Sequence, residues 1–482
     1  MKTHLGIDII HLGGEETVTG SCHLLQANGL NIMVDCGLAQ GNDSVLPMKS
    51  WPVAPSDIDY LFLTHAHIDH IGRVPELIER GFSGEIICSH PTKALLIPML
   101  QDAMGFTDWP EKKIDKLLRT IHDLSWGFEY REVFSLKKGI KFRLGCAGHI
   151  LGSCWIQFDI SDYMTVVFSG DLGVRDTPIL CDPDVPEGCD LLIMESTYGD
   201  RNHEGRGDRI KRLGEILLRA ITDGGKVFIP AFSLGRTQEL IYEMDRIRQR
   251  SEVSGQRSEK DRPARNALAC EAGGGRKSEV GDRKEIEVGG QKAEFRIPVF
   301  VDSPLGLEIT KIYSSLSEYW DKEAKALKVK GDHPIDFEGL YAVGRFRDHK
   351  QLLEMEGLAI VIAGSGMCTG GRIVEHLKAG IEDPRNDILF VGYQANGTSG
   401  RDILKYSKRP GGYVMLDGEK FDIKAKVHQL TGYSAHADQK GLVEWIEAMP
   451  ERPGRIKLVH GEIKAREAMR RALDESRWDL DE

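Results

Sequence analysis

The stretch THAHIDHIG at positions 64–72 contains three histidines and one aspartate within six positions: His65, His67, Asp69 and His70. Imidazole is the commonest neutral metal ligand in proteins, and carboxylate is a good partner for zinc or manganese. If His65 and His67 point the same way, Asp69 and His70 lie around the bend and can serve a second ion. The alternative, histidines that only fill a polar loop, is disfavoured by this spacing. The stretch therefore predicts a site for two metal ions.

Two ions need further ligands, and several ionisable residues follow apolar segments. Asp171 follows MTVVFSG, Glu195 ends DLLIME, and His460 follows IKLV. A rigid sheet can aim side chains that lie at strand ends. His149 in AGHILGS adds an imidazole, and Asp35 after NIMV is a carboxylate that can fix the orientation of a histidine. Each residue alone could be a polar strand terminus, but together with the histidine cluster they favour a metal centre.

Apolar periodicity indicates the elements that must position these residues. Residues 61–64 form a short apolar run, and apolar residues from Ile71 to Ile78 recur at helical spacing before Gly81, so the cluster lies on a strand-to-helix loop. Residues 11–37 are typical of antiparallel strands and turns. From about residue 190 onward, strand, loop and helix patterns alternate, which predicts a mainly parallel sheet flanked by helices. The predicted fold class is α/β.

Length and composition exclude several classes of protein. A chain of 482 residues is too long for a domain with one ordinary hydrophobic core, so two domains are expected. No apolar run is long enough to cross a bilayer, and the first ten residues lack a signal-peptide core, so no membrane partner is expected. The nine cysteines are scattered without a CxxC pair, which fits a reducing, cytoplasmic location. The net charge of -11 means that a polyanion must be held by a local patch or by metal ions.

One segment, residues 250–295, fits neither pattern. It is rich in charged residues, Gly and Ser and poor in apolar residues. Such a composition cannot bury enough surface to offset the entropy lost on ordering the backbone. The segment is therefore predicted to be a mobile, disordered surface insertion.

The motifs THAHIDHIG, MESTYGD, GYSAHAD and LVHGE, in this order, resemble those of the metallo-β-lactamase superfamily in its β-CASP branch of RNA- and DNA-processing nucleases. The chain looks most like bacterial and archaeal relatives of the endonuclease subunit of cleavage and polyadenylation specificity factor. The resemblance extends from Gly13 to Glu462. It implies an αββα sandwich formed by residues 1–199 and 426–482, interrupted by a β-CASP domain of parallel-sheet α/β type at residues 200–425.

The resemblance also implies roles for the candidate residues. One zinc ion would be held by His65, His67 and His149, and a second by Asp69, His70 and His460, with Asp171 bridging them and manganese as the alternative metal. Asp35 would lie behind these ligands. His436 of SAHAD would donate a proton to the leaving group beside Glu195, and Asp69 is also counted among the catalytic residues. A surface-loop histidine is the alternative for His436.

RNA contacts are expected at two loops of the β-CASP region. PAFSLGRTQE carries Arg236 and Gln238, and GSGMCTGG carries Ser365 and Gly366. The glycine spacing of the second loop does not match the dinucleotide-binding fingerprint. Two roles are left open for this loop: a contact with an RNA phosphate, or a tight structural turn. A buried ion pair is the alternative for Arg236. Single-stranded RNA is the expected partner, with a homodimer as an expected assembly.

The resemblance implies a zinc-dependent ribonuclease that hydrolyses single-stranded RNA through a metal-bound hydroxide. Paired cations can lower the pKa of water and clamp a phosphodiester oxygen. Endonucleolytic cleavage in RNA processing or decay is expected, with a 5′-to-3′ exonuclease mode beside it. Two alternatives stay open: a small-molecule hydrolase that uses the same metals, and a noncatalytic RNA-processing subunit. The large inserted region and SAHAD favour the nuclease.

Overall fold

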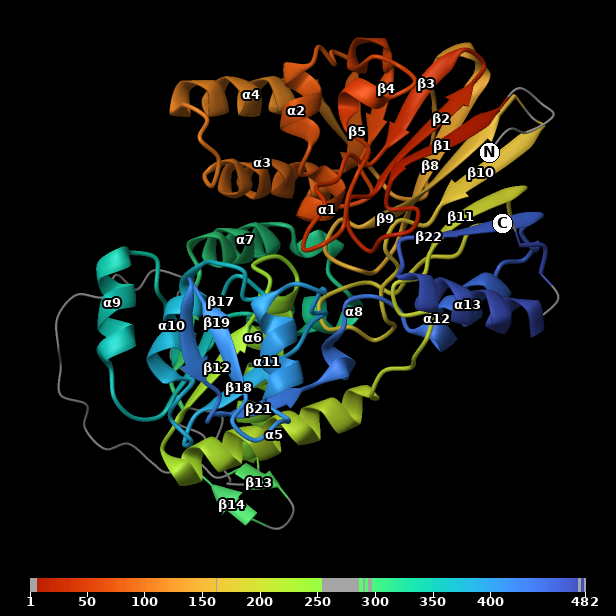
Figure 1. Cartoon of the computed structure of the whole chain (residues 1–482). Coiled ribbons are helices and arrows are strands. Elements are labelled where there is room, and N and C mark those ends of the chain that lie inside the picture. Colours follow the sequence, from red (N-terminus) through yellow and green to blue (C-terminus); the bar gives the residue numbers. More distant parts are fainter. Residues whose placement is uncertain are drawn as a thin grey trace. The chain divides into compact units, whose positions relative to one another are not determined.

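The computed structural model describes residues 7–161, 163–253, 286–288, 291–293, 297–475 and 478–480 (Figure 1). The chain forms two compact units. Unit 1 comprises Met1–Asn202, Leu316–Asp321 and Ala435–Glu482, and unit 2 comprises His203–Ser315 and Lys322–Ser434. Among the described residues, no helix combines the length and the apolar character needed to cross a membrane.

Unit 1 contains two six-stranded sheets. The first has the order β1 (Asp8–Gly13), β2 (Cys22–Ala27), β3 (Leu30–Val34), β4 (Tyr60–Phe62), β5 (Glu85–Ser89), β6 (Ser125–Phe128). The second has the order β22 (Arg455–Val459), β11 (Leu191–Glu195), β10 (Met164–Phe168), β9 (Cys154–Ile160), β8 (Ile140–Cys146), β7 (Val133–Ser135). The predicted antiparallel start is confirmed, because β1, β2 and β3 pair antiparallel.

The two sheets of unit 1 enclose an apolar core. Phe62 of β4 packs edge to face against Phe142 of β8 and Phe158 of β9, with ring centroids 5.0 and 4.8 Å apart. Helices α1 (Ile68–Ile71), α2 (Val74–Glu79), α3 (His90–Met104) and α4 (Glu111–Leu124) accompany the first sheet. Helices α12 (Gln439–Glu447) and α13 (Ile463–Glu475) pack on the second through a cluster that includes Trp155 and Trp445. These layers form the predicted αββα sandwich.

One local expectation needs correction. A single helix was predicted up to Gly81, but the chain forms the short helices α1 and α2 with a break at Gly72 and Arg73. Pro75 lies in the first turn of α2, where its missing N–H costs no helical hydrogen bond. The break separates the turn that carries Asp69 and His70 from the rest of the helical segment.

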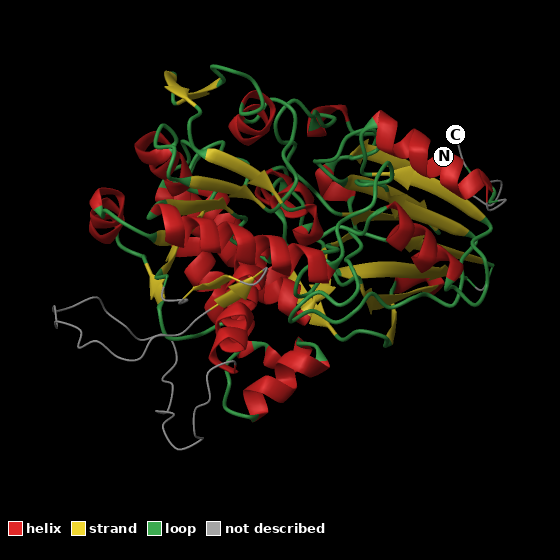
Figure 2. Cartoon of the chain, turned by 90° about the horizontal axis from the view of Figure 1, so that it is seen from below, coloured by secondary structure: helices red, strands yellow, loops and turns green. Residues whose placement is uncertain are grey.

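Unit 2 is built on one parallel six-stranded sheet, as predicted. Its order is β16 (Leu340–Ala342), β15 (Val299–Asp302), β17 (Ala359–Ala363), β12 (Lys226–Pro230), β18 (Asp387–Phe390), β21 (Lys426–Gln429). Its helices are α5 (Arg206–Asp223), α6 (Arg236–Val253), α7 (Pro304–Ser315), α8 (Lys322–Val329), α9 (Phe346–Glu354), α10 (Arg372–Gly380) and α11 (Ser399–Tyr406). Figure 2 colours these helices red and the strands yellow.

Two hairpins complete unit 2: β13 (Ile286–Val288) with β14 (Gln291–Ala293), and β19 (Tyr413–Leu416) with β20 (Glu419–Asp422). The predicted insertion at 250–295 lies largely outside the described residues. Within it, the end of α6 and the hairpin β13–β14 are described. The expectation of a mobile, disordered insertion falls on the residues outside these parts and stays a prediction.

Candidate metal centre

The seven predicted ligands converge in unit 1 at the ends of its strands. His65 and His67 lie on the loop between β4 and α1, and His149 lies on the loop between β8 and β9. Asp171 follows β10 and His460 follows β22. Strands β10, β11 and β22 are parallel neighbours, so their carboxyl ends share one edge of the sheet. This shared edge explains how residues 289 positions apart in the sequence, Asp171 and His460, come together.

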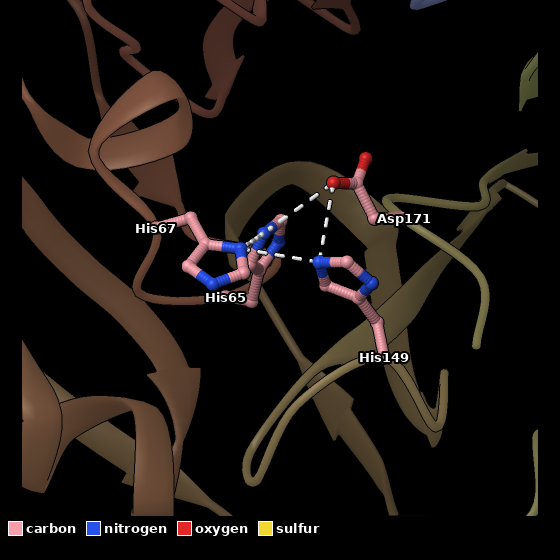
Figure 3. Close-up of side chains that lie close together, drawn as sticks. All are labelled: His65, His67, His149 and Asp171. Atoms are coloured by element: carbon pink, nitrogen blue, oxygen red, sulfur yellow. Dashed lines mark hydrogen bonds and ion pairs between the residues drawn. The ribbon is translucent and has the colours of Figure 1, made fainter. Parts of the chain in front are cut away.

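Three imidazoles and one carboxylate form the first ligand group (Figure 3). His67 Nδ1 lies 3.1 Å from both His65 Nε2 and His149 Nε2. Asp171 Oδ2 lies 3.5 Å from His65 Nε2 and 3.6 Å from His149 Nε2. Tetrahedral zinc with Zn–N bonds near 2.0–2.1 Å holds its ligand nitrogens about 3.3 Å apart. The spacing of these atoms therefore fits one metal ion.

A second ligand group adjoins the first. His70 Nε2 lies 3.2 Å from His460 Nε2, and Asp69 Oδ2 lies 4.0 and 3.8 Å from these two nitrogens. Asp171 contacts both histidines, with Oδ2 3.3 Å from His70 Nε2 and Oδ1 3.7 Å from His460 Nε2. Asp171 thus contacts both ligand groups. Within the second group, its Oδ2 lies near His70 and its Oδ1 lies near His460.

The electrostatics of the site suit a divalent cation. Burial lowers the pKa of His65 and His149 well below the usual value and that of His67 to about 4, so these rings are neutral with lone pairs available. Burial alone would raise the pKa of Asp171, but the surrounding histidines, His460 first, hold it well below its usual value. The three neutral imidazoles of the first group face the ionised Asp171 and form a suitable donor set for zinc.

Residues behind the ligands orient them. His70 Nδ1 lies 2.7 Å from Asp35 Oδ2, which turns Nε2 toward His460 and Asp171. Thr64 Oγ1 lies 3.1 Å from His65 Nδ1 and also donates to Asp35. Thr197 Oγ1 lies 3.1 Å from His460 Nδ1. The sequence alone identified Asp35 but neither threonine. The available signals were the position of Thr64 directly before His65 in THAH and the position of Thr197 two residues after Glu195 in ESTY.

His436 and Glu195 form a pair at the edge of the metal-ligand cluster. His436 Nδ1 lies 3.2 and 3.3 Å from the two carboxylate oxygens of Glu195 and 3.8 Å from Asp171 Oδ2. The backbone N–H of Leu172 donates to Glu195 at 2.6 Å and fixes the carboxylate. Burial alone would lower the pKa of His436, but Glu195 and Asp171 together raise it to about 9. The pair therefore holds a proton on an imidazole beside the ligands.

The residues predicted to contact RNA at PAFSLGRTQE are buried within unit 2. Arg236 forms an ion pair with Glu239, so the alternative interpretation of this arginine describes the structure better. Gln238 is fully buried, and its amide bonds Thr310 Oγ1 at 2.9 Å and Gly235 N at 2.8 Å. These partners hold the side chain inside unit 2, which favours a structural role for Gln238, and its contact with RNA stays a prediction.

The loop at residues 364–371 joins β17 to α10. Ser365 is partly exposed, and its Oγ accepts a hydrogen bond from the backbone N–H of Thr369 at 3.1 Å. Gly366 is buried against Phe232, whose backbone N lies 3.0 Å from the position that a Cβ would take. Ser365 is thus the more accessible of the two predicted contacts, and Gly366 is required by close packing.

Comparisons with known proteins agree with the geometry. The model of the metallo-beta-lactamase superfamily matches residues 16–231, that of the Beta-Casp domain residues 286–403, and that of the Zn-dependent metallo-hydrolase RNA specificity domain residues 420–481. These matches together cover both units, and they confirm the predicted family and fold class.

Relatives and one solved structure extend the comparison. Ribonuclease TTHA0252 from Thermus thermophilus is 33% identical over 457 residues, covering 94% of this chain and 93% of that protein. Transcription termination factor FttA from Methanosarcina mazei is 31% identical, covering 95% of this chain and 67% of that protein. The crystal structure of a protein of unknown function from Enterococcus faecalis V583 covers 94% of each chain at 12% identity with a TM-score of 0.50, a likeness of fold alone.

The enzyme class follows from these matches and from the paired ligand groups, and it confirms the predicted metal-dependent hydrolase. With a relative 33% identical over nearly the full length of both proteins, the chain belongs to the β-CASP family of the metallo-β-lactamase superfamily.

Proposed function

We propose that this protein is a zinc-dependent ribonuclease that cleaves single-stranded RNA endonucleolytically, in RNA processing or decay. The observation that carries the proposal is the pair of ligand groups that share Asp171. The Thermus thermophilus relative is named a ribonuclease, and the match to an RNA specificity domain at residues 420–481 supports an RNA substrate. The cytoplasmic location and the homodimer stay predictions.

The ligand residues would hold two zinc ions, with manganese as the alternative. His65, His67 and His149 would hold one, Asp69, His70 and His460 the other, and Asp171 would lie between them. When bound, two divalent cations supply the Lewis acidity that activates water and neutralises charge on a phosphodiester. Asp35, Thr64 and Thr197 fix the ring orientations of three of the ligand histidines through their second nitrogens.

His436 is proposed to supply the proton that the departing oxygen requires. Its Nδ1 faces Glu195, so Nε2 is the ring atom that carries a proton available for transfer. Glu195 keeps the ring protonated at neutral pH, because the charge of a carboxylate stabilises the imidazolium form. Divalent cations at the neighbouring ligands would lower the pKa of His436 from about 9 toward neutrality, where a general acid works best.

The test is a substrate comparison with the purified, zinc-loaded protein. A circular single-stranded RNA, a linear RNA labelled at either end, a single-stranded DNA of the same sequence and a chromogenic lactam are incubated with the wild type and with Asp171→Asn. We expect the wild type to linearise the circle, which has no end for an exonuclease, and Asp171→Asn to be inactive.

Cleavage restricted to the lactam would support the small-molecule hydrolase instead. Stepwise shortening of the linear RNA with an intact circle would replace the endonuclease with an exonuclease. Absence of turnover on every substrate, with both zinc ions bound, would favour the noncatalytic subunit.

A further inference from the structure

A chain of polar contacts leads from the metal centre through the first sheet of unit 1. It starts at Asp35, which follows β3 and contacts His70 Nδ1 at 2.7 Å. Asp35 also accepts hydrogen bonds from the backbone N–H and the hydroxyl of Thr64, at 2.8 and 2.9 Å, and from Ser21 Oγ at 3.2 Å. A carboxylate that receives four donors is fixed in position, and it acts only as an acceptor.

Beyond Asp35 the contacts continue to two histidines that have no part in the mechanism described above. Ser21 Oγ lies 3.4 Å from His23 Nε2, and His23 Nδ1 lies 2.8 Å from His11 Nδ1. His11 and His23 are direct cross-strand partners on β1 and β2. His23 is buried with 4% of its surface exposed, whereas His11 is partly exposed. The chain His11–His23–Ser21–Asp35–His70 therefore connects a metal ligand with a partly exposed residue.

The acceptor character of Asp35 sets the direction of every link. Ser21 must donate its only hydroxyl hydrogen to Asp35, because a carboxylate oxygen supplies none. The Ser21 oxygen is then free to accept from His23 Nε2–H. Burial lowers the pKa of His23 well below its usual value and that of His11 to about 3, so each ring carries a single N–H. With its hydrogen on Nε2, His23 accepts at Nδ1 from His11 Nδ1–H.

The opposite arrangement, with the hydrogen on His23 Nδ1, is less favourable. Ser21 would then donate to His23 Nε2, and two oxygen atoms without a hydrogen between them would face each other at the Ser21–Asp35 contact of 3.2 Å. A cavity of about 20 Å³ is lined by Ser21, His23, Asp35 and His70 together with the candidate metal ligands Asp171 and His460, so the chain adjoins the second ligand group.

We propose that His23 and His11 are positioning residues for the second metal ion, through a hydrogen-bond chain that runs in one direction from His11 to Asp35. The proposal rests on the metal-binding part of the proposed function. The chain keeps Asp35 aimed at His70 Nδ1, and His70 accordingly presents Nε2 toward His460. Neither histidine touches a ligand group directly, so their effect is on the metal held by His70 and not on the proton transfer assigned to His436.

The test measures zinc binding by the full-length protein, with a chromophoric chelator as competitor and zinc alone as the probe. His23→Phe keeps a ring but removes both nitrogens, and we expect it to weaken the second zinc site about 3- to 10-fold, below the 10- to 100-fold typical of residues that contact a ligand directly. The first site should keep its affinity. Ser21→Ala should produce the same loss, and the double variant little more, because both break one chain.

Two variants separate positioning from a general structural role. His23→Gln retains a donor where Nε2 lies, so it should restore most of the affinity of the second site. Gln26 lies on the same strand as His23, and Gln26→Ala removes only its contact with Asn31 of β3, so this variant should leave both sites unchanged. In the metal-free wild type, nitrogen chemical shifts of labelled histidines should show the hydrogen of His23 on Nε2.

The outcomes distinguish this proposal from the proposed function. Unchanged affinity of the second site in both His23→Phe and Ser21→Ala, or a hydrogen on Nδ1 of His23, overturns the chain while leaving the metal centre intact. Equal losses in His23→Gln and His23→Phe also contradict it. If His23→Phe does not fold, Ser21→Ala decides, because it removes one oxygen and keeps the ring. A wild-type protein that binds no zinc overturns the metal centre itself.

Discussion

Replacement of His436 by Ala separates proton donation from metal binding. Seven other side chains form the two ligand groups, and His436 Nδ1 is directed at Glu195. His436→Ala should therefore keep both zinc ions. Loss of a general acid typically costs about 10²- to 10⁴-fold in rate, or roughly 3–5 kcal/mol in the barrier.

The contact with Glu195 accounts for the protonation of His436 and not for the size of the rate loss. A rise of the His436 pKa from 6.5 to about 9 corresponds to roughly 3 kcal/mol of stabilisation of the protonated ring. The ring is largely buried, with 17% of the side chain exposed, so little of this value is lost to solvent screening. The expected loss in kcat rests on the usual cost of removing a general acid.

The assay follows cleavage of a fluorescent RNA under saturating zinc, with bound zinc measured in the same samples. Only protonated His436 donates, so wild-type activity should fall as the pH rises through the His436 pKa. In Glu195→Gln the decline should begin at lower pH, because the carboxylate that raises the pKa is absent. A substrate with sulfur in place of the departing oxygen needs no proton and should recover most of the His436→Ala loss. An unrecovered loss, or one zinc missing from His436→Ala, would refute the assignment.

Three further predictions concern the ligands, unit 2 and the insertion. Asp171→Ala should lower zinc occupancy and abolish RNA hydrolysis, whereas Asp35→Asn should weaken zinc binding by about 10- to 100-fold. Metal analysis and an RNase assay on the same samples check both variants. Full zinc occupancy together with full activity in Asp171→Ala would contradict the proposed site. Gln238→Ala should destabilise the protein by about 1–3 kcal/mol, because the buried partners of Gln238 lose their hydrogen bonds, and it should leave RNA affinity unchanged. Melting curves and an RNA binding assay test this prediction. Weaker RNA binding at unchanged stability would support a direct contact between Gln238 and RNA instead. Replacing residues 254–285 with a short Gly/Ser bridge should leave zinc content and melting temperature intact, given their composition, and a large drop in melting temperature would count against it.

Local sequence patterns indicate the candidate ligands, and the resemblance to the family divides them into two groups. His65, His67, Asp69 and His70 lie within one loop and one helical turn, and Asp171 and His460 end parallel strands that share an edge. Such positions can be recognised from an apolar run followed by an ionisable residue.

Features that depend on tertiary packing could not be predicted in this way. The burial of Gln238 arises because α7 supplies Thr310 from 72 positions away, which no local pattern reveals. The pairing of His11 with His23 depends on strand register and on a bulge between His11 and Gly13. The contacts of Thr64 and Thr197 require knowledge of ring orientation. The break between α1 and α2 had a local signal in Gly72 and Pro75, but hydrophobic spacing alone favoured one continuous helix.

The measurement that tests the central claim most directly is cleavage of circular single-stranded RNA by metal-stripped protein as zinc is added back in known equivalents. Two ligand groups that share Asp171 predict that linearisation appears as the second equivalent binds and reaches its maximum near two per chain. Cleavage that persists in the stripped protein, or that is complete at one equivalent, would contradict a two-metal ribonuclease.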